Sequence, residues 1–130
     1  MMKIGWQPGK WLEKKAKLGN RGLPVGTIAY YGPDDRRASK VVASVFRTSL
    51  DELDEMRKWF SDTSDVRRDG KIAGEIAAFF RAEEVRSVSM IDRIIGCPHE
   101  EGIDYPKGEA CPQCPFWTGR DRWTGEKLKS

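Results

Sequence analysis

Residues 27–47 read TIAYYGPDDRRASKVVASVFR. The stretch begins and ends with runs rich in β-branched and aromatic residues, at 27–31 and 40–47, and such runs favour strands. The letters between them include GPDD at 32–35, which are typical turn residues. We therefore expect an antiparallel hairpin with a charged tip. The second run is apolar on both of its alternating faces, which predicts a central place in a sheet.

Two helices and a further strand are expected after the hairpin. Residues 49–60 begin with Ser49 and Glu52 at the spacing of a capping box, and their apolar residues recur at helical intervals. These apolar residues are Leu50, Leu53, Met56 and Phe60. The second helix is predicted in 70–84, with an apolar stripe formed by Ile72, Ile76, Phe79 and Phe80. A third strand is expected in 85–95.

The expected order of elements is therefore ββααβ, without βαβ alternation. It predicts an α+β fold, in which a small antiparallel or mixed sheet carries two helices on one face. We expect a basic N-terminal segment in 1–25, an α+β core in 26–95 and a metal-stabilised C-terminal loop module in 96–130. A short helix within 10–20 is expected only if it docks on the core, because isolated helices of that length are unstable in water.

The composition excludes several classes of protein. Hydrophobic residues make up 38% of the 130 residues and charged residues 33%, which is typical of a soluble globular chain. No apolar run approaches the roughly 20 residues of a membrane span, and the first residues do not form a signal peptide pattern. A disulfide framework would leave one of the three cysteines unpaired, which favours a reducing compartment. We therefore expect a cytoplasmic protein without a membrane partner.

All three cysteines and the only histidine lie in 96–117, GCPHEEGIDYPKGEACPQCPFW. Their spacing is C-x-H-x11-C-x2-C, formed by Cys97, His99, Cys111 and Cys114. Zinc prefers four tetrahedral ligands drawn from thiolate and imidazole, and each short-spaced pair can turn both of its side chains toward one ion. The sequence therefore predicts bound Zn²⁺. An iron–sulfur cluster with one histidine ligand is the alternative.

The CPQCP letters at 111–115 resemble the knuckles of zinc-ribbon and rubredoxin-like sites, and the resemblance covers only 96–117. The segments H-x-E at 99–101 and C-x-x-C at 111–114 are also similar to those of zinc-dependent nucleobase deaminases, which would make Glu101 a general acid/base. The 11-residue spacer is too short for the helix and strand of that family. Cys97 would also close the open position that catalysis requires. We therefore expect no catalytic residue, and a zinc-dependent hydrolase or deaminase is the least favoured function.

Basic residues gather near both ends of the chain. Residues 1–25 hold six of them against Glu13 alone, and basic and aromatic residues alternate after 115. Such segments suit contact with phosphates and stacking on bases. We therefore expect a small, non-catalytic zinc-binding protein that contacts nucleic acid, with a protein–protein adaptor or inhibitor module as the alternative. The predicted contact residues are Lys10, Lys14, Lys15, Lys17, Arg21, Arg120, Arg122 and Trp123. Phe116 and Trp117 are instead expected to pack the metal module onto the rest of the chain.

Overall fold

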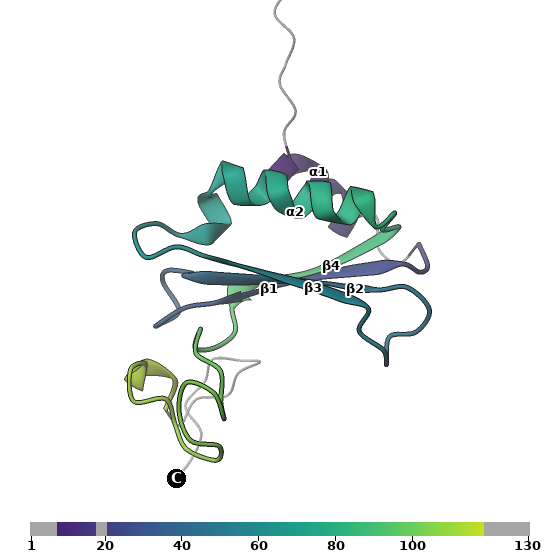
Figure 1. Ribbon diagram of the computed structural model, residues 1–130. Helices are drawn as coiled ribbons and strands as arrows, with labels where there is room; N and C mark the ends of the chain where they lie inside the picture. Colours follow the sequence, from purple (N-terminus) through teal and green to yellow (C-terminus); the bar gives the residue numbers. More distant parts are fainter. Residues whose placement is uncertain (1–7, 18–20, 119–130) are drawn as a thin grey trace, which may run out of the picture. The chain divides into compact units, whose positions relative to one another are not determined.

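The computed structural model describes residues 8–17 and 21–118 (Figure 1). The fold is α+β, as predicted, and its elements in chain order are α1 (Pro8–Lys17), β1 (Val25–Tyr31), β2 (Lys40–Phe46), β3 (Glu55–Phe60), the 3₁₀ helix η1 (Val66–Arg68), α2 (Gly70–Ala82), β4 (Ser87–Ile94) and the 3₁₀ helix η2 (Pro115–Trp117).

The four strands form one sheet in the order β3-β2-β1-β4. The predicted hairpin of β1 and β2 is present, and β2 lies between two neighbours, as its apolar faces indicated. β1 and β4 run parallel. Arg86 N donates to Pro24 O near the beginnings of these strands at 2.8 Å, and Ile95 N donates to Tyr30 O near their ends at 2.9 Å. The sheet is therefore mixed.

The prediction of a helix in 49–60 is wrong, and with it the order ββααβ. These residues form a turn followed by β3, which pairs with β2. Ser49 does not begin a capping box: its Oγ accepts a hydrogen bond from Asp51 N at 3.1 Å, inside the turn. Asp54 N donates to Val45 O at 3.0 Å and closes a second hairpin.

The helical spacing of apolar residues in 49–60 does not produce a helix, because these side chains do not pack on a core. The four apolar side chains of the expected stripe are all exposed, with Leu50 at 66%, Leu53 at 49%, Met56 at 45% and Phe60 at 63%. A helix is stabilised mainly by packing its apolar stripe on a core. If 49–60 formed a helix, the backbone groups along the open edge of β2 would have no strand to pair with. The pairing of β3 with β2 satisfies these groups.

The chain divides into two compact units, each made of three chain segments. The first holds the described residues of Met1–Ile28, Val42–Arg57 and Arg68–Met90. The second holds the described residues of Ala29–Val41, Lys58–Arg67 and Ile91–Ser130. Every strand of the sheet contributes residues to both units. The boundaries expected from the sequence, at 25/26 and 95/96, stay a prediction.

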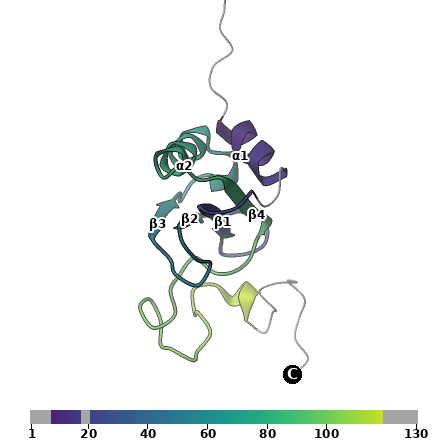
Figure 2. The same ribbon diagram turned by 90° about the vertical axis from the view of Figure 1, so that its right-hand side faces the viewer.

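The first unit contains both α-helices, which lie side by side on the same side of its strands (Figure 1, Figure 2). α1 docks on α2 and buries Leu12, which meets the condition that the sequence set for so short a helix. α2 begins at Asp69, whose carboxylate caps the amides of Lys71 at 2.9 Å and Ile72 at 3.1 Å. All four residues of its predicted stripe are buried.

Gly26 of β1 makes room for one of these buried side chains, Phe80. A Cβ atom at Gly26 would lie 2.8 Å from the ring of Phe80, which is fully buried. Real Cβ atoms do not approach so closely, so the absence of a side chain in β1 lets the Phe80 ring lie against the strand.

Candidate metal centre

The second unit brings all four predicted metal ligands together. Their ligand atoms, three sulfurs and one imidazole nitrogen, lie within 4.8 Å of one another. Cys97 and His99 follow the end of β4, and Cys111 and Cys114 lie in the turn that leads into η2. Cys111 is 7% exposed and Cys114 is 2% exposed. The group is a candidate metal site built from two loops.

The distances within the group match one common ion. His99 Nδ1 lies 3.3 Å from Cys97 Sγ and 3.4 Å from the Sγ atoms of Cys111 and Cys114. A tetrahedral zinc with Zn–S near 2.3 Å and Zn–N near 2.0–2.1 Å separates sulfur from nitrogen by about 3.6 Å. Nδ1 is thus nearly equidistant from three sulfurs, at a separation close to that of a shared tetrahedral ion.

Short turns in both pairs point the ligands inward. His99 N donates to Cys97 Sγ at 3.3 Å, which holds the first pair in a tight turn. In the second pair, Cys114 N donates to Cys111 O at 3.4 Å. Pro115 then begins η2, where its fixed φ angle suits the first position of a helical turn.

Burial disfavours the thiolate form of two candidate ligands. It raises the pKa of Cys97 and, more strongly, the pKa of Cys114, because a thiolate without a metal would be poorly solvated there. Metals bind the thiolate form, so metal uptake releases protons, and acid competes with the metal.

The spacer between the ligand pairs is a loop closed by hydrogen bonds of its own. Glu100 N donates to Asp104 Oδ2 at 2.7 Å. Gly108 N donates to the Glu101 carboxylate, also at 2.7 Å. Gly102 and Gly108 have φ angles of 84° and 88°, in the left-handed region that favours glycine. Glu101, the residue that a deaminase would use for proton transfer, therefore has its carboxylate engaged in closing this loop.

Trp117 ties the ligand loop to the β1–β2 hairpin, which agrees with the packing role expected for it. Its Nε1 donates to Gly32 O at 2.7 Å, and Gly32 N donates to Gly96 O at 2.9 Å. The ring of Phe116 packs edge-on against Trp117, with centroids 4.9 Å apart. A Cβ at Gly32 would lie 2.0 Å from Arg37 O, so the turn requires glycine.

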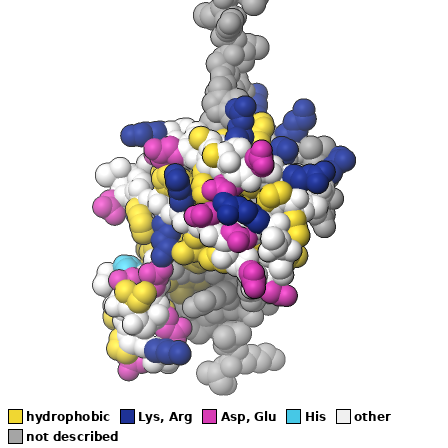
Figure 3. Space-filling view, turned by 45° about the vertical axis from the view of Figure 1, so that its right-hand side comes forward, with side chains coloured by type: hydrophobic (Ala, Val, Ile, Leu, Met, Phe, Trp, Pro, Cys, Tyr) yellow, Lys and Arg dark blue, Asp and Glu magenta, His cyan; other side chains and the backbone are white. Residues whose placement is uncertain are grey.

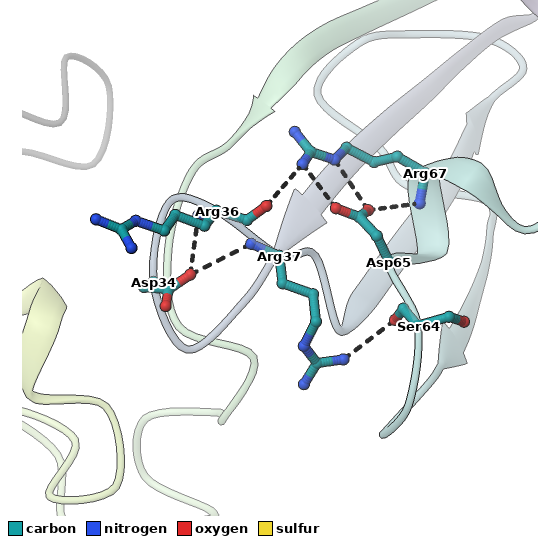
Figure 4. Close-up of polar contacts among 6 residues, drawn as sticks. All are labelled: Asp34, Arg36, Arg37, Ser64, Asp65 and Arg67. Carbon is teal, nitrogen blue, oxygen red and sulfur yellow. Dashed lines mark hydrogen bonds and ion pairs between the residues drawn. The ribbon is translucent and has the colours of Figure 1, made fainter.

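Polar contacts hold this hairpin to the segment after β3 (Figure 4). The Asp34 carboxylate accepts from the amides of Arg36 at 2.8 Å and Arg37 at 3.2 Å, which is the turn role expected of this aspartate. The Arg67 guanidinium donates to Asp65 at 2.7 and 3.0 Å and to Arg36 O at 3.2 Å. The hydrogen bond from Arg67 lowers the pKa of Asp65 to about 2.

Lys40 is the residue near the ligands that the sequence analysis missed. Its Nζ donates to Pro98 O at 3.0 Å, between Cys97 and His99, and lies 3.9 Å from the Glu100 carboxylate. The available signal was a lysine at the start of the apolar run of a central strand, where a buried charge needs a partner. Lys40 and His99 also line an open cavity of about 520 Å³ within the second unit.

The structure describes five of the eight predicted contact residues. Lys10, Lys14, Lys17 and Arg21 are exposed, and the ammonium of Lys15 lies 5.6 Å from the centre of the Trp11 ring. Basic and acidic side chains are interspersed over much of the face in Figure 3. Arg120, Arg122 and Trp123 lie outside the described residues. Contact with nucleic acid or with a protein therefore stays a prediction.

No family model, no curated protein and no solved structure matches this chain. Among the described residues, no helix combines the length and the apolar character needed to cross a membrane.

Proposed function

We propose that the chain is a small, non-catalytic binding protein whose C-terminal part folds around a structural zinc ion. The observation that carries the proposal is the position of His99 Nδ1, at 3.3–3.4 Å from all three sulfurs. Four protein ligands fill a tetrahedral zinc and leave no position for a catalytic water, so the ion would stabilise structure. Sulfur and nitrogen ligands in this number favour zinc over magnesium or calcium.

The metal content of the purified protein tests this proposal. Protein prepared without added metal should contain about one zinc per chain, measured by elemental analysis and by mass spectrometry under native conditions. The Cys111→Ser variant should lose the zinc, because three ligands bind more weakly than four. Gln113→Ala is the matched control, since Gln113 is an exposed residue of the same turn. A folded wild-type protein that takes up no zinc contradicts the proposal. Bound iron in place of zinc would support the alternative, an iron–sulfur cluster.

Nucleic acid is the partner that we propose for this protein. Support comes from α1, where Lys10, Lys14 and Lys17 are exposed, and from Arg21, which follows later in the chain and is also exposed. The sequence of 1–25 holds a single acidic residue, Glu13. Binding through such residues releases counterions, so the affinity should fall steeply with salt concentration.

A charge-matched pair of variants tests the nucleic-acid proposal. Replacing Lys10, Lys14 and Lys17 by glutamine should weaken binding to mixed-sequence DNA and RNA and reduce its salt dependence. Replacing Arg68, Lys71 and Lys107 by glutamine removes the same charge from exposed positions elsewhere. Equal losses of affinity in both triple variants would show that binding depends on net charge and not on the basic residues of α1. Absent or salt-independent binding of the wild type would exclude the proposal.

A protein-interaction module is the second candidate, and exposed apolar residues of the first unit favour it. Leu50, Leu53 and Met56 lie within seven residues and are 45–66% exposed. The discriminating experiment isolates the tagged protein from its cells with and without nuclease treatment. A protein partner that survives nuclease and is lost on Leu50→Ser/Leu53→Ser supports the module. A partner that nuclease removes supports nucleic-acid binding.

A further inference from the structure

Lys40 is a buried cation of the second unit, and only 7% of its side chain is exposed. Its Nζ lies 5.5 Å from the centre of the Tyr31 ring and 5.7 Å from that of Phe60. Glu100 is its acidic neighbour, at 3.9 Å, but Glu100 also pairs with Lys58. Burial lowers the pKa of Lys40, and Glu100 acts in the opposite direction. Asp104 also favours the ammonium form, more weakly than Glu100. A buried ammonium that shares its nearest carboxylate gains stability from further negative charge nearby.

One peptide group links this ammonium to a candidate metal ligand. Lys40 Nζ donates to the carbonyl oxygen of Pro98 at 3.0 Å. The N–H of the same peptide group, that of His99, donates to Cys97 Sγ at 3.3 Å. A peptide whose oxygen accepts a hydrogen bond from a cation becomes a stronger N–H donor, because hydrogen bonds in a chain polarise one another. The charge of Lys40 thus acts on the sulfur through the 98–99 peptide.

The proposed zinc site provides negative charge near Lys40. Three thiolates, one neutral imidazole and Zn²⁺ carry one net negative charge, which a single buried ammonium neutralises. Groups outside the ligand shell commonly orient metal ligands and tune the affinity for the metal.

We infer that Lys40 is a positioning residue of the metal centre: its ammonium holds the 97–99 turn and stabilises the Cys97 thiolate as a ligand through the 98–99 peptide. The inference rests on the proposed zinc site. It joins the start of β2 to the ligand loop and gives a reason for a lysine at the start of a central strand.

The test compares the affinity for zinc of the full chain and three variants, by competition with a chromophoric chelator. Lys40→Met and Lys40→Gln should each weaken zinc binding about tenfold or more, as loss of an outer-shell partner does at other metal sites. Lys58→Met is the matched control, because Lys58 pairs with the same carboxylate and its side chain is 30% exposed. Its affinity should stay within about twofold of the wild type.

A spectroscopic readout separates this role from simple packing. In the cobalt-substituted protein, the sulfur-to-cobalt charge-transfer band should move to longer wavelength in both Lys40 variants, because thiolate electrons rise in energy when the nearby cation is removed. Lys58→Met should leave the band in place. Lys40→Gln keeps a neutral donor for Pro98 O, so it isolates the loss of charge even where Lys40→Met fails to fold.

The outcomes distinguish the two proposals. A wild type that binds zinc, together with a folded Lys40→Gln variant of unchanged affinity and unchanged cobalt band, overturns the role of Lys40 and leaves the zinc site intact. A wild type that binds neither zinc nor cobalt overturns both.

Discussion

The first unit and the segment 97–118 bury different kinds of side chain. In the first unit, apolar side chains such as Ile28, Val45 and Phe80 are fully buried. Within 97–118, the buried side chains are those of Cys111 and Cys114, both candidate metal ligands. Apolar burial contributes about 25 cal/mol per Å² to folding in the first unit, whereas the zinc that we propose would order the segment 97–118. With the zinc that we propose, one short chain would draw on two sources of stability.

Metal removal should separate the two regions most clearly. A strong chelator should abolish amide-exchange protection in 97–118 and leave the amides of α2 protected, because a structural zinc contributes about 10–16 kcal/mol of binding free energy to such a segment. Hydrogen exchange followed by mass spectrometry measures both regions in one sample. A protein whose α2 loses protection in step with 97–118 would show that the two regions do not differ in this way.

Truncating the core of the first unit is the converse change. Phe80→Ala should lower the free energy of unfolding by about 3–5 kcal/mol, because it leaves a cavity where a fully buried ring lay. Phe60→Ala is the control, since Phe60 is 63% exposed and should change stability by less than about 1 kcal/mol. Denaturant unfolding measures both variants. Zinc content should stay the same in folded Phe80→Ala protein, and its loss would argue that the metal site depends on this core.

The link between hairpin and ligand loop predicts a smaller effect. Gly32→Ala places a Cβ against Arg37 O, a backbone atom that cannot move without opening the turn. We expect a loss of about 1–3 kcal/mol in unfolding free energy, as for other steric insertions. A Cβ at Gly70 meets no atom within 4 Å, so Gly70→Ala is the control. If both variants unfold at the same denaturant concentration, the contact from Trp117 to Gly32 O does not require this turn geometry.

The smallest expected effect concerns acid stability. The folded-state pKa of Asp65 is about 2, below its ordinary value of 3.8, because Arg67 donates to its carboxylate. A lowered carboxyl pKa stabilises the fold above about pH 4, and this contribution is lost as the pH falls toward 2. Between these pH values, wild type should lose about 1–2 kcal/mol more stability than Asp65→Asn, since partial solvent screening reduces the effect.

Urea unfolding at several pH values measures this difference, and any metal loss in acid is common to both proteins and cancels. The exposed Asp62 provides the control variant, Asp62→Asn. An Asp65→Asn protein with the same acid profile as wild type would contradict the ion pair with Arg67.

The sequence predicted correctly the features that depend on residues close together in the chain. The ligand set needed only the spacing of Cys97, His99, Cys111 and Cys114, because each pair is a short turn. The helix α2 needed only its apolar stripe. The segment 49–60 shows the limit of such patterns: its spacing was helical, but no core receives the stripe, and the open edge of β2 takes the backbone instead.

The sequence by itself therefore determined the α+β class, the hairpin of β1 and β2, the helix α2 and the grouping of the four candidate ligands, since local spacing and turn chemistry encode them. Only the tertiary structure decided that residues 55–60 form β3, that Trp117 binds Gly32 O, and that Lys40 reaches the peptide between Cys97 and His99. No local spacing or turn chemistry specifies the partners of these features. β3 depends on the open edge of β2, Trp117 on a carbonyl 85 positions away and Lys40 on a carbonyl 58 positions away.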